Sequence, residues 1–183
     1  MTTILLTIIL CFVFWGCCYI STGGDEKNIK AYATYPDKVQ AYVRNDPLLK
    51  EQIEKANLLV SPNPVRTFLA NTVLFFAVLF LLGIFVRTDS FAVNLLRLTI
   101  MGQGLNLFDY LVIDLLWWRN TKRIRFTGTE DRPELYHDPQ KHTVSFVKGI
   151  VMFFLVALAD GILLTLFQEL YPQGRERDHS EPL

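Results

Sequence analysis

The sequence has 183 residues, with 18 lysines and arginines against 18 aspartates and glutamates, so its formal net charge at pH 7 is zero. A neutral chain offers no electrostatic field for nucleic acid, and nucleic-acid binding is excluded as an expected function. Hydrophobic residues make up 51% of the chain, and residues 1–20 and 68–86 carry no charge at all. Since about 20 apolar residues span the hydrocarbon core of a bilayer, the composition predicts an integral membrane protein.

The first predicted span covers residues 4–20 and contains all three cysteines, Cys11, Cys17 and Cys18. These thiols have no spacing typical of a zinc or redox site, and lipid-facing side chains are their simplest interpretation. Palmitoylation of Cys17 or Cys18 is an alternative interpretation. The run lacks a basic n-region and an A-x-A-like cleavage site, so we expect a retained helix rather than a cleaved signal peptide.

The connection over residues 21–63 contains two short segments with helical periodicity. The first lies near residues 36–44, and the second begins at Asp46-Pro47, where aspartate can cap a helix and proline suits its first turn. Asn63-Pro64 and Asp138-Pro139 repeat this pattern before the second and fourth spans. The apolar stripes of the two short helices are Val39, Tyr42 and Val43, and Leu49, Ile53 and Ala56.

The second predicted span covers residues 64–86. The third, over residues 94–118, is the least obvious of the predicted spans. Its apolar residues contribute about 3 to 6 kcal/mol of insertion, against a cost of about 2.5 to 3.5 kcal/mol for each central aspartate. We therefore expect it to insert only with partners in a bundle, with its polar side against the fourth span, 148–170. The polar residues expected at this contact, here named the polar seam, are Gln103, Asn106, Asp109, Tyr110, Asp114, Asp160 and Gln168.

Lysines and arginines concentrate in residues 21–67 and 119–148. The positive-inside rule then places both long connections, 21–63 and 119–147, in the cytoplasm and both termini outside the cell membrane. Within the second connection, residues 122–129 alternate apolar and basic side chains, which predicts a short hairpin or an extended loop. The basic cluster next to the third span is also a candidate contact for anionic lipid headgroups: Arg119, Lys122, Arg123 and Arg125.

We assume that Trp118 of the third span and Val147 before the fourth lie at the same cytoplasmic membrane boundary, and that these two spans are antiparallel. Counting residues inward from this boundary then places Asp160 at the same depth as Asn106 and close to the depth of Asp109. Two interpretations follow. Asp109 and Asp160 share a proton or bind a cation or polar solute, or the amide and hydroxyl donors hold these acids as structural glue between helices. The same count places Asp114 within reach of Lys148 or Arg119, and pairs Arg97 with Glu169 at the outer boundary.

No HExxH, GxSxG, CxxC or P-loop pattern occurs, so we expect no catalytic residue, no bound metal and no cofactor. His137 and His142 are five residues apart and do not share a helical face, and Asp138 is already explained as a cap. A metal-dependent membrane enzyme using Asp109, Asp160 or the His137 region is the third functional hypothesis.

The segments Leu105–Asp109 and Asp114–Arg119, together with Tyr35–Gln40, resemble a group of small bacterial multi-pass proteins, some of them labelled permease components of ABC transporters. The resemblance covers about a third of the chain and implies a transport or permease-like component. The runner-up is a scaffold or assembly subunit that recruits a partner through its cytoplasmic helices. We expect a membrane or cytoplasmic protein partner, or self-association.

The fold prediction is an all-α single membrane domain over residues 1–183. It consists of a four-transmembrane-helix bundle, short amphipathic helices in the first long connection, and a flexible tail over residues 172–183.

Overall fold

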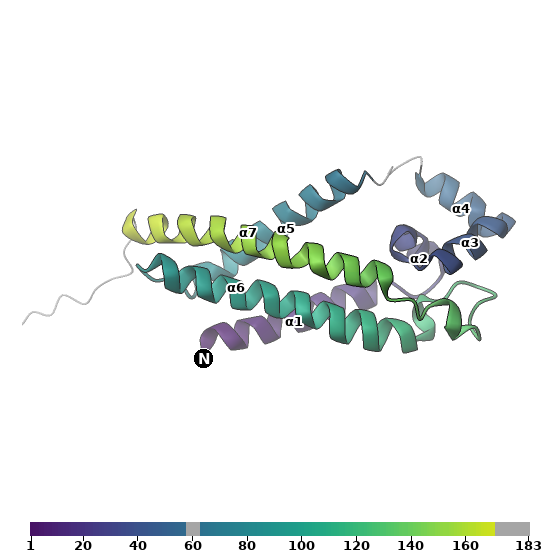
Figure 1. Ribbon diagram of the computed structural model, residues 1–183, viewed down its shortest axis with the longest axis horizontal. Helices are drawn as coiled ribbons and strands as arrows, with labels where there is room; N and C mark the ends of the chain where they lie inside the picture. Colours follow the sequence, from purple (N-terminus) through teal and green to yellow (C-terminus); the bar gives the residue numbers. More distant parts are fainter. Residues whose placement is uncertain (58–62, 171–183) are drawn as a thin grey trace, which may run out of the picture.

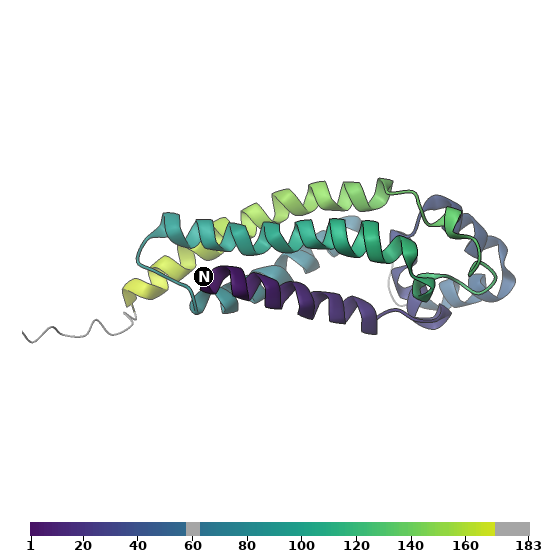
Figure 2. The same cartoon turned by 90° about the horizontal axis from the view of Figure 1, so that it is seen from below.

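The structure, a computed structural model, describes residues 1–57 and 63–170, and these residues form helices and connecting loops without a β-strand. Four long helical stretches run side by side along one axis, and the short helices gather at one end (Figures 1 and 2). The long stretches are α1 (Thr2–Ile20), α5 (Pro64–Ile84), α6 (Phe91–Phe108) continued by the π-helix η2 (Asp109–Trp118), and α7 (Gln140–Leu170). Three helices are long and apolar enough to cross a membrane: Thr2–Ile20, Val65–Ile84 and Gln140–Gln168.

The all-α prediction is therefore confirmed, whereas the fourth span is not among these three helices. The region predicted as a span over residues 94–118 is helical throughout, but its composition is more polar and its second part is π-helical. The last helix begins at Gln140, eight residues before the predicted start of the span at Lys148. The predicted tail over residues 172–183 lies outside the described residues.

The helix starts marked by Asp-Pro and Asn-Pro pairs are present. Asn63 Oδ1 accepts a hydrogen bond from the backbone N–H of Val65 at 2.9 Å, and Asp138 Oδ1 accepts one from Gln140 at 3.0 Å. Asp46 Oδ1 likewise accepts from the backbone N–H of Leu48 at 2.9 Å. Each side chain replaces a partner that the first turn of a helix lacks, which is why these positions fix where the helices begin.

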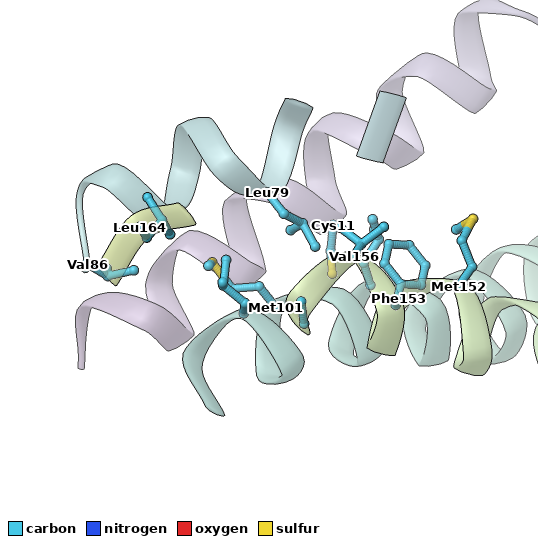
Figure 3. Packing of buried hydrophobic residues seen from close by; sticks show 11 residues of the cluster. Cys11, Leu79, Val86, Met101, Met152, Phe153, Val156 and Leu164 are labelled. Atoms are coloured by element: carbon cyan, nitrogen blue, oxygen red, sulfur yellow. The ribbon is translucent and has the colours of Figure 1, made fainter. Parts of the chain in front are cut away.

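The core of the bundle is apolar and lies between α5, α6 and α7, with Cys11 of α1 at its edge (Figure 3). Leu79, Leu98, Met101 and Leu164 are at most 1% exposed. The outward faces of α1 and α5 expose aliphatic and aromatic side chains over most of their lengths. This arrangement suits lipid around the bundle, because hydrocarbon tails accept apolar side chains that water would not.

The two long connections fold together into a small second core, here named the cap, made of residues 21–57 and 119–139. Its short helices are α2 (Asp25–Asn28), η1 (Ile29–Thr34), α3 (Asp37–Asn45), α4 (Pro47–Asn57), η3 (Lys122–Ile124) and η4 (Pro133–Leu135). Tyr35 lies fully buried at its centre, with ring centroids 5.1 Å from Trp118 and 5.0 Å from Phe126. Its hydroxyl donates to the carbonyl of Ile124 at 2.9 Å, and burial raises the pKa of Tyr35.

Polar contacts also join the two connections. Asn28 Nδ2 donates to the carbonyl of Arg123 at 3.2 Å, and Asp37 Oδ1 lies 2.8 Å from Lys141 Nζ at the start of α7. The hydrogen bond and charge of Lys141 hold the pKa of the Asp37 carboxyl below its usual value. Both connections therefore lie at the same end of the bundle, which is the arrangement that their shared basic character predicted.

The two amphipathic helices expected in the first connection are α3 and α4. Val39, Val43, Leu49 and Ile53 are all buried in the cap, and the side chain of Ala56 lies outside the described part. These apolar faces belong to one buried cluster that also contains Ile124 and Phe126 of the second connection. Of the two alternatives expected for residues 122–129, the hairpin is absent: the segment is a 3₁₀ turn followed by a loop, and Ile124 and Phe126 are buried in the cap.

Candidate polar site between α6 and α7

The most extensive helix interface in the described structure joins α6 to α7, and small residues bring the two backbones close together. A side chain at Gly149 would overlap the amide of Asn106, and one at Gly102 would overlap the ring of Phe153. Asn106 Nδ2 donates to the carbonyl of Phe146 at 3.2 Å. Close approach thus allows a polar side chain of α6 to reach the backbone of α7, as glycine does in other membrane bundles.

Gln103 makes the same kind of contact one turn farther from the cap, where its Nε2 donates to the carbonyl of Ile150 at 2.9 Å. Toward the cap, the hydroxyl of Tyr110 lies 3.0 Å from that of Thr143, and the ring of Tyr110 stacks on Phe146. Three of the residues expected in the polar seam therefore lie against α7. Each of them is satisfied by a neutral partner.

The ionisable pair of the interface lies next to the cap. His142 Nδ1 is 2.8 Å from Asp114 Oδ1, and the two side chains are only 10% and 14% exposed. The other ring nitrogen of His142, Nε2, is buried without a hydrogen-bond partner among the described residues, and so is Nε1 of Trp118. The Trp118 and His142 rings meet edge to face with centroids 5.7 Å apart, so this pair joins the bundle to the cap.

Asp109 completes the group. It lies within electrostatic range of Asp114 and His142, and Cys18 of α1 lies within range of both carboxyl groups. In an α-helix with 3.6 residues per turn, Asp109 and Asp114 would be about 140° apart. A π-helix closes its hydrogen bonds over five residues, which widens each turn and brings residues five apart toward one face. The π-helical winding of η2 thus places both acids near one histidine.

Asp160 lies elsewhere in the bundle. Asn106 packs on Gly149, and Gly161 packs on Phe91 and Leu95 near the far end of α6, so Asp160 is not level with Asn106. Eleven residues separate Gly149 from Asp160 on α7, or about 16 Å at 1.5 Å per residue. The expected meeting of Asn106, Asp109 and Asp160 is therefore wrong.

The error comes from the boundary chosen on α7. Asp114 is level with His142, so the residue beside Trp118 lies before Val147 and close to the start of the helix. The expected contact of Asp114 with Lys148 or Arg119 is replaced by the contact with His142. Sequence spacing along α7 carries no signal for a partner on η2, so the sequence alone does not pair His142 with Asp114.

At the far end, the remaining expected contacts are partly described. Gln168 Oε1 accepts a hydrogen bond from Arg87 Nε at 2.6 Å. Arg97 donates to the backbone carbonyl of Val86, which closes the α5–α6 connection. The side chain of Glu169 lies outside the described residues, so the predicted pair between Arg97 and Glu169 stays a prediction.

Three of the four basic residues expected to meet lipid headgroups make contacts within the protein. Arg123 lies over the ring of Tyr19 at 4.0 Å and donates to its carbonyl at 3.0 Å, at the end of α1. Lys122 Nζ lies 2.9 Å from Asp131, and Arg125 donates to the carbonyl of Glu130. Arg119 has no such contact in the described part of the chain.

Among the described residues, no three His, Cys, Asp or Glu side chains converge as a metal ion would require. The arrangement that the structure does provide is a nearly buried carboxyl–imidazole pair, with the carboxyl group of Asp109 within electrostatic range. Such a group can hold or pass a proton, because either ring nitrogen of an imidazole can carry one and an adjacent carboxylate fixes which of them does.

The chain matches no family model, no curated protein and no solved structure.

Proposed function

We propose that the protein is a small, non-catalytic membrane transport component in which the Asp114–His142 pair, with Asp109 beside it, handles a proton. The observation that carries this proposal is the 2.8 Å contact between two nearly buried ionisable side chains, one of which has a ring nitrogen without a hydrogen-bond partner among the described residues. Ionisable residues within a membrane bundle are costly and commonly mark ion or proton pathways.

The neutral contacts along the interface support this choice over structural glue at this position. Gln103, Asn106 and Tyr110 already join α6 to α7 through uncharged groups. A buried ion pair adds little to stability, because the desolvation of two charges offsets their attraction. Helix association alone therefore does not account for the ionisable pair or for the second acid, Asp109.

The course of the chain supports a membrane crossing by α6 and η2. The cap contains the segments before α5 and before α7, so both helices start at the same end of the bundle (Figure 1). If α5 and α7 each cross the bilayer, the chain must return between them, and residues 91–118 are the only segment that does so. Satisfied polar contacts with α7 would lower the cost of inserting this less apolar stretch.

The basic residues of the cap favour a cytoplasmic cap, which puts the Asp114–His142 pair near the cytoplasmic boundary. A permease-like role agrees with the resemblance carried by residues 105–119. Because the sequence has no ATP-binding motif, an ATP-driven form of this role requires a partner subunit.

Proton flux into liposomes with a trapped pH-sensitive dye tests the proposal. Under an imposed potential, the wild-type protein should acidify the lumen faster than protein-free liposomes. Asp114→Asn and His142→Gln should abolish this difference, and Tyr110→Phe, which alters a neutral contact of the same interface, should retain most of it. Wild-type flux equal to that of Asp114→Asn would refute the proposal.

A scaffold or assembly subunit is the second candidate, and one observation favours it. Two of the polar side chains of α6 donate to backbone carbonyls of α7, which is the behaviour of interhelical glue. In that case Asp114→Asn should lower the amount of protein in the membrane without any transport phenotype. Copurification with identification of bound proteins would then find the partner.

A further inference from the structure

Asp160 is the one carboxyl group of the described structure that is fully buried and without a partner. Asp160 as a whole is 0% exposed, and neither Oδ1 nor Oδ2 of its carboxyl group has a hydrogen-bond partner among the described residues. The site described above does not explain it, because Asp160 lies about 16 Å along α7 from the position of Asn106.

The buried face of α7 on either side of Asp160 is apolar. Val156 and Leu164 lie one turn away on the same face of α7, and both belong to the bundle core, together with Leu79 of α5 and Leu98 of α6 (Figure 3). An isolated carboxylate in such surroundings is so costly that the group takes up a proton instead.

The facing helices offer few charges to prevent this. Between Arg66 and Arg87, α5 carries no ionisable side chain, and between Lys148 and Glu169 the only one on α7 is Asp160 itself. On α6, Arg97 is the only ionisable residue between Asp89 and Asp109, and its guanidinium donates to the carbonyl of Val86.

The nearby polar side chains are also engaged. Asn94 Nδ2 donates to the carbonyl of Thr88 and to Thr165 Oγ1, each at 2.9 Å, and Thr165 itself donates to the carbonyl of Gly161. A calcium ion takes 6 to 8 oxygen ligands and magnesium takes an octahedral set. The two unpartnered oxygens of Asp160 do not supply such a set, whereas they suit a single proton.

We propose that Asp160 is a proton-binding site in the interface of α5, α6 and α7, where the carboxyl group is protonated in the resting protein at neutral pH. The proton makes the side chain neutral and lets the apolar core close around it. Loss of the proton leaves a buried negative charge that must recruit water or draw Arg97 away from Val86. This inference does not depend on proton transport by the Asp114–His142 pair.

Infrared difference spectroscopy of the full chain in detergent micelles tests it. A protonated carboxyl group gives a C=O stretching band above the amide I band, and an ionised one does not. At pH 7 the wild-type protein should show such a band, which Asp160→Asn removes and which shifts in heavy water once the site exchanges. The control Asp138→Asn, which changes an exposed carboxyl group, should leave the band in place.

Equal wild-type and Asp160→Asn spectra at pH 7 would overturn the proposal, since the carboxyl group would then be ionised, through Arg97 or otherwise. If Asp160→Asn does not fold, Asp160→Glu provides the comparison, because its band should remain and move in frequency. The wild-type band should be present from acidic pH up to pH 7, and its loss at or below pH 7 would equally reject a resting protonated state.

Discussion

Substituting Asp114 and His142 singly, and then both together, should give losses of stability that are strongly non-additive. In Asp114→Leu, the buried Nδ1 of His142 loses its partner at 2.8 Å, and in His142→Leu the carboxyl group of Asp114 loses its donor. An unsatisfied buried polar group costs about 1 to 3 kcal/mol, so each single variant should lose about 2 kcal/mol.

The double variant removes both polar groups and leaves two apolar side chains in contact. Replacing both partners by apolar groups is often nearly neutral, so we expect a loss of about 1 kcal/mol. The coupling free energy between the two positions is then about 3 kcal/mol, at the upper end of what contacting residues show. Because the side chains are 10% and 14% exposed, water can do little to relieve the single variants.

Equilibrium unfolding in mixed micelles, followed by tryptophan fluorescence, measures these free energies of unfolding. The neutral pair Tyr110→Phe and Thr143→Val, from the same interface, is the matched control, and its coupling should not exceed about 1 kcal/mol. A double Leu variant that loses as much as the two single variants together, about 4 kcal/mol, would refute the contact.

Two further predictions concern packing and pH. Gly149→Ala should lower the free energy of unfolding by about 1 to 3 kcal/mol in the same assay, because the added methyl group displaces the Asn106 amide. At Gly16 an added methyl group meets no neighbour, so Gly16→Ala should raise the free energy of unfolding by about 0.5 to 1 kcal/mol, since alanine is the better helix former. Burial raises the pKa of Tyr35 and of Tyr136, so the folded cap favours their neutral forms. The contribution of these two side chains to the stability of the cap should therefore be complete below about pH 10 and should be lost as the pH rises further. Phenolate absorbance during an alkaline titration should rise together with unfolding of the cap, and independent titration at the ordinary tyrosine value would contradict the burial of both rings.

Local features of the fold were predictable from the sequence because each depends on neighbouring residues. Asn63 and Asp138 mark helix starts through hydrogen bonds to backbone groups two residues ahead. The stripes of Val39 and Val43, and of Leu49 and Ile53, indicate which helix faces are buried. Their shared cluster with Ile124 and Phe126 was not predictable, since it depends on how two distant connections meet.

The register of α7 against α6 was not predictable from the sequence. Depth counted from Trp118 and Val147 assumes that a charged residue, Lys148, marks the membrane boundary. In the structure, α7 begins at Gln140 and pairs its first turn with η2, so Asp160 moves toward the far end and His142 meets Asp114. In this register Gly149 lets the Asn106 amide approach α7 closely.

The π-helical winding of η2 was also not predictable from the sequence. At α-helical spacing Tyr110 and Asp114 share a face, and Asp109 falls beside them. A change to five-residue hydrogen bonding depends on the packing of the whole helix rather than on a local residue preference. It places Asp109 within electrostatic range of Asp114 and His142.

We expect residues 91–118 to cross the bilayer between a cytoplasmic cap and an outer α5–α6 connection. Single cysteines tested in intact cells with a membrane-impermeant maleimide measure this directly, in a chain whose own Cys11, Cys17 and Cys18 are replaced by alanine. Asp89→Cys should react from outside, Lys38→Cys should react only after the membrane is opened, and Leu107→Cys, on the exposed face of α6, should react in neither case. Labelling of Leu107→Cys in intact cells, or of Asp89→Cys and Lys38→Cys from the same side, would contradict the crossing.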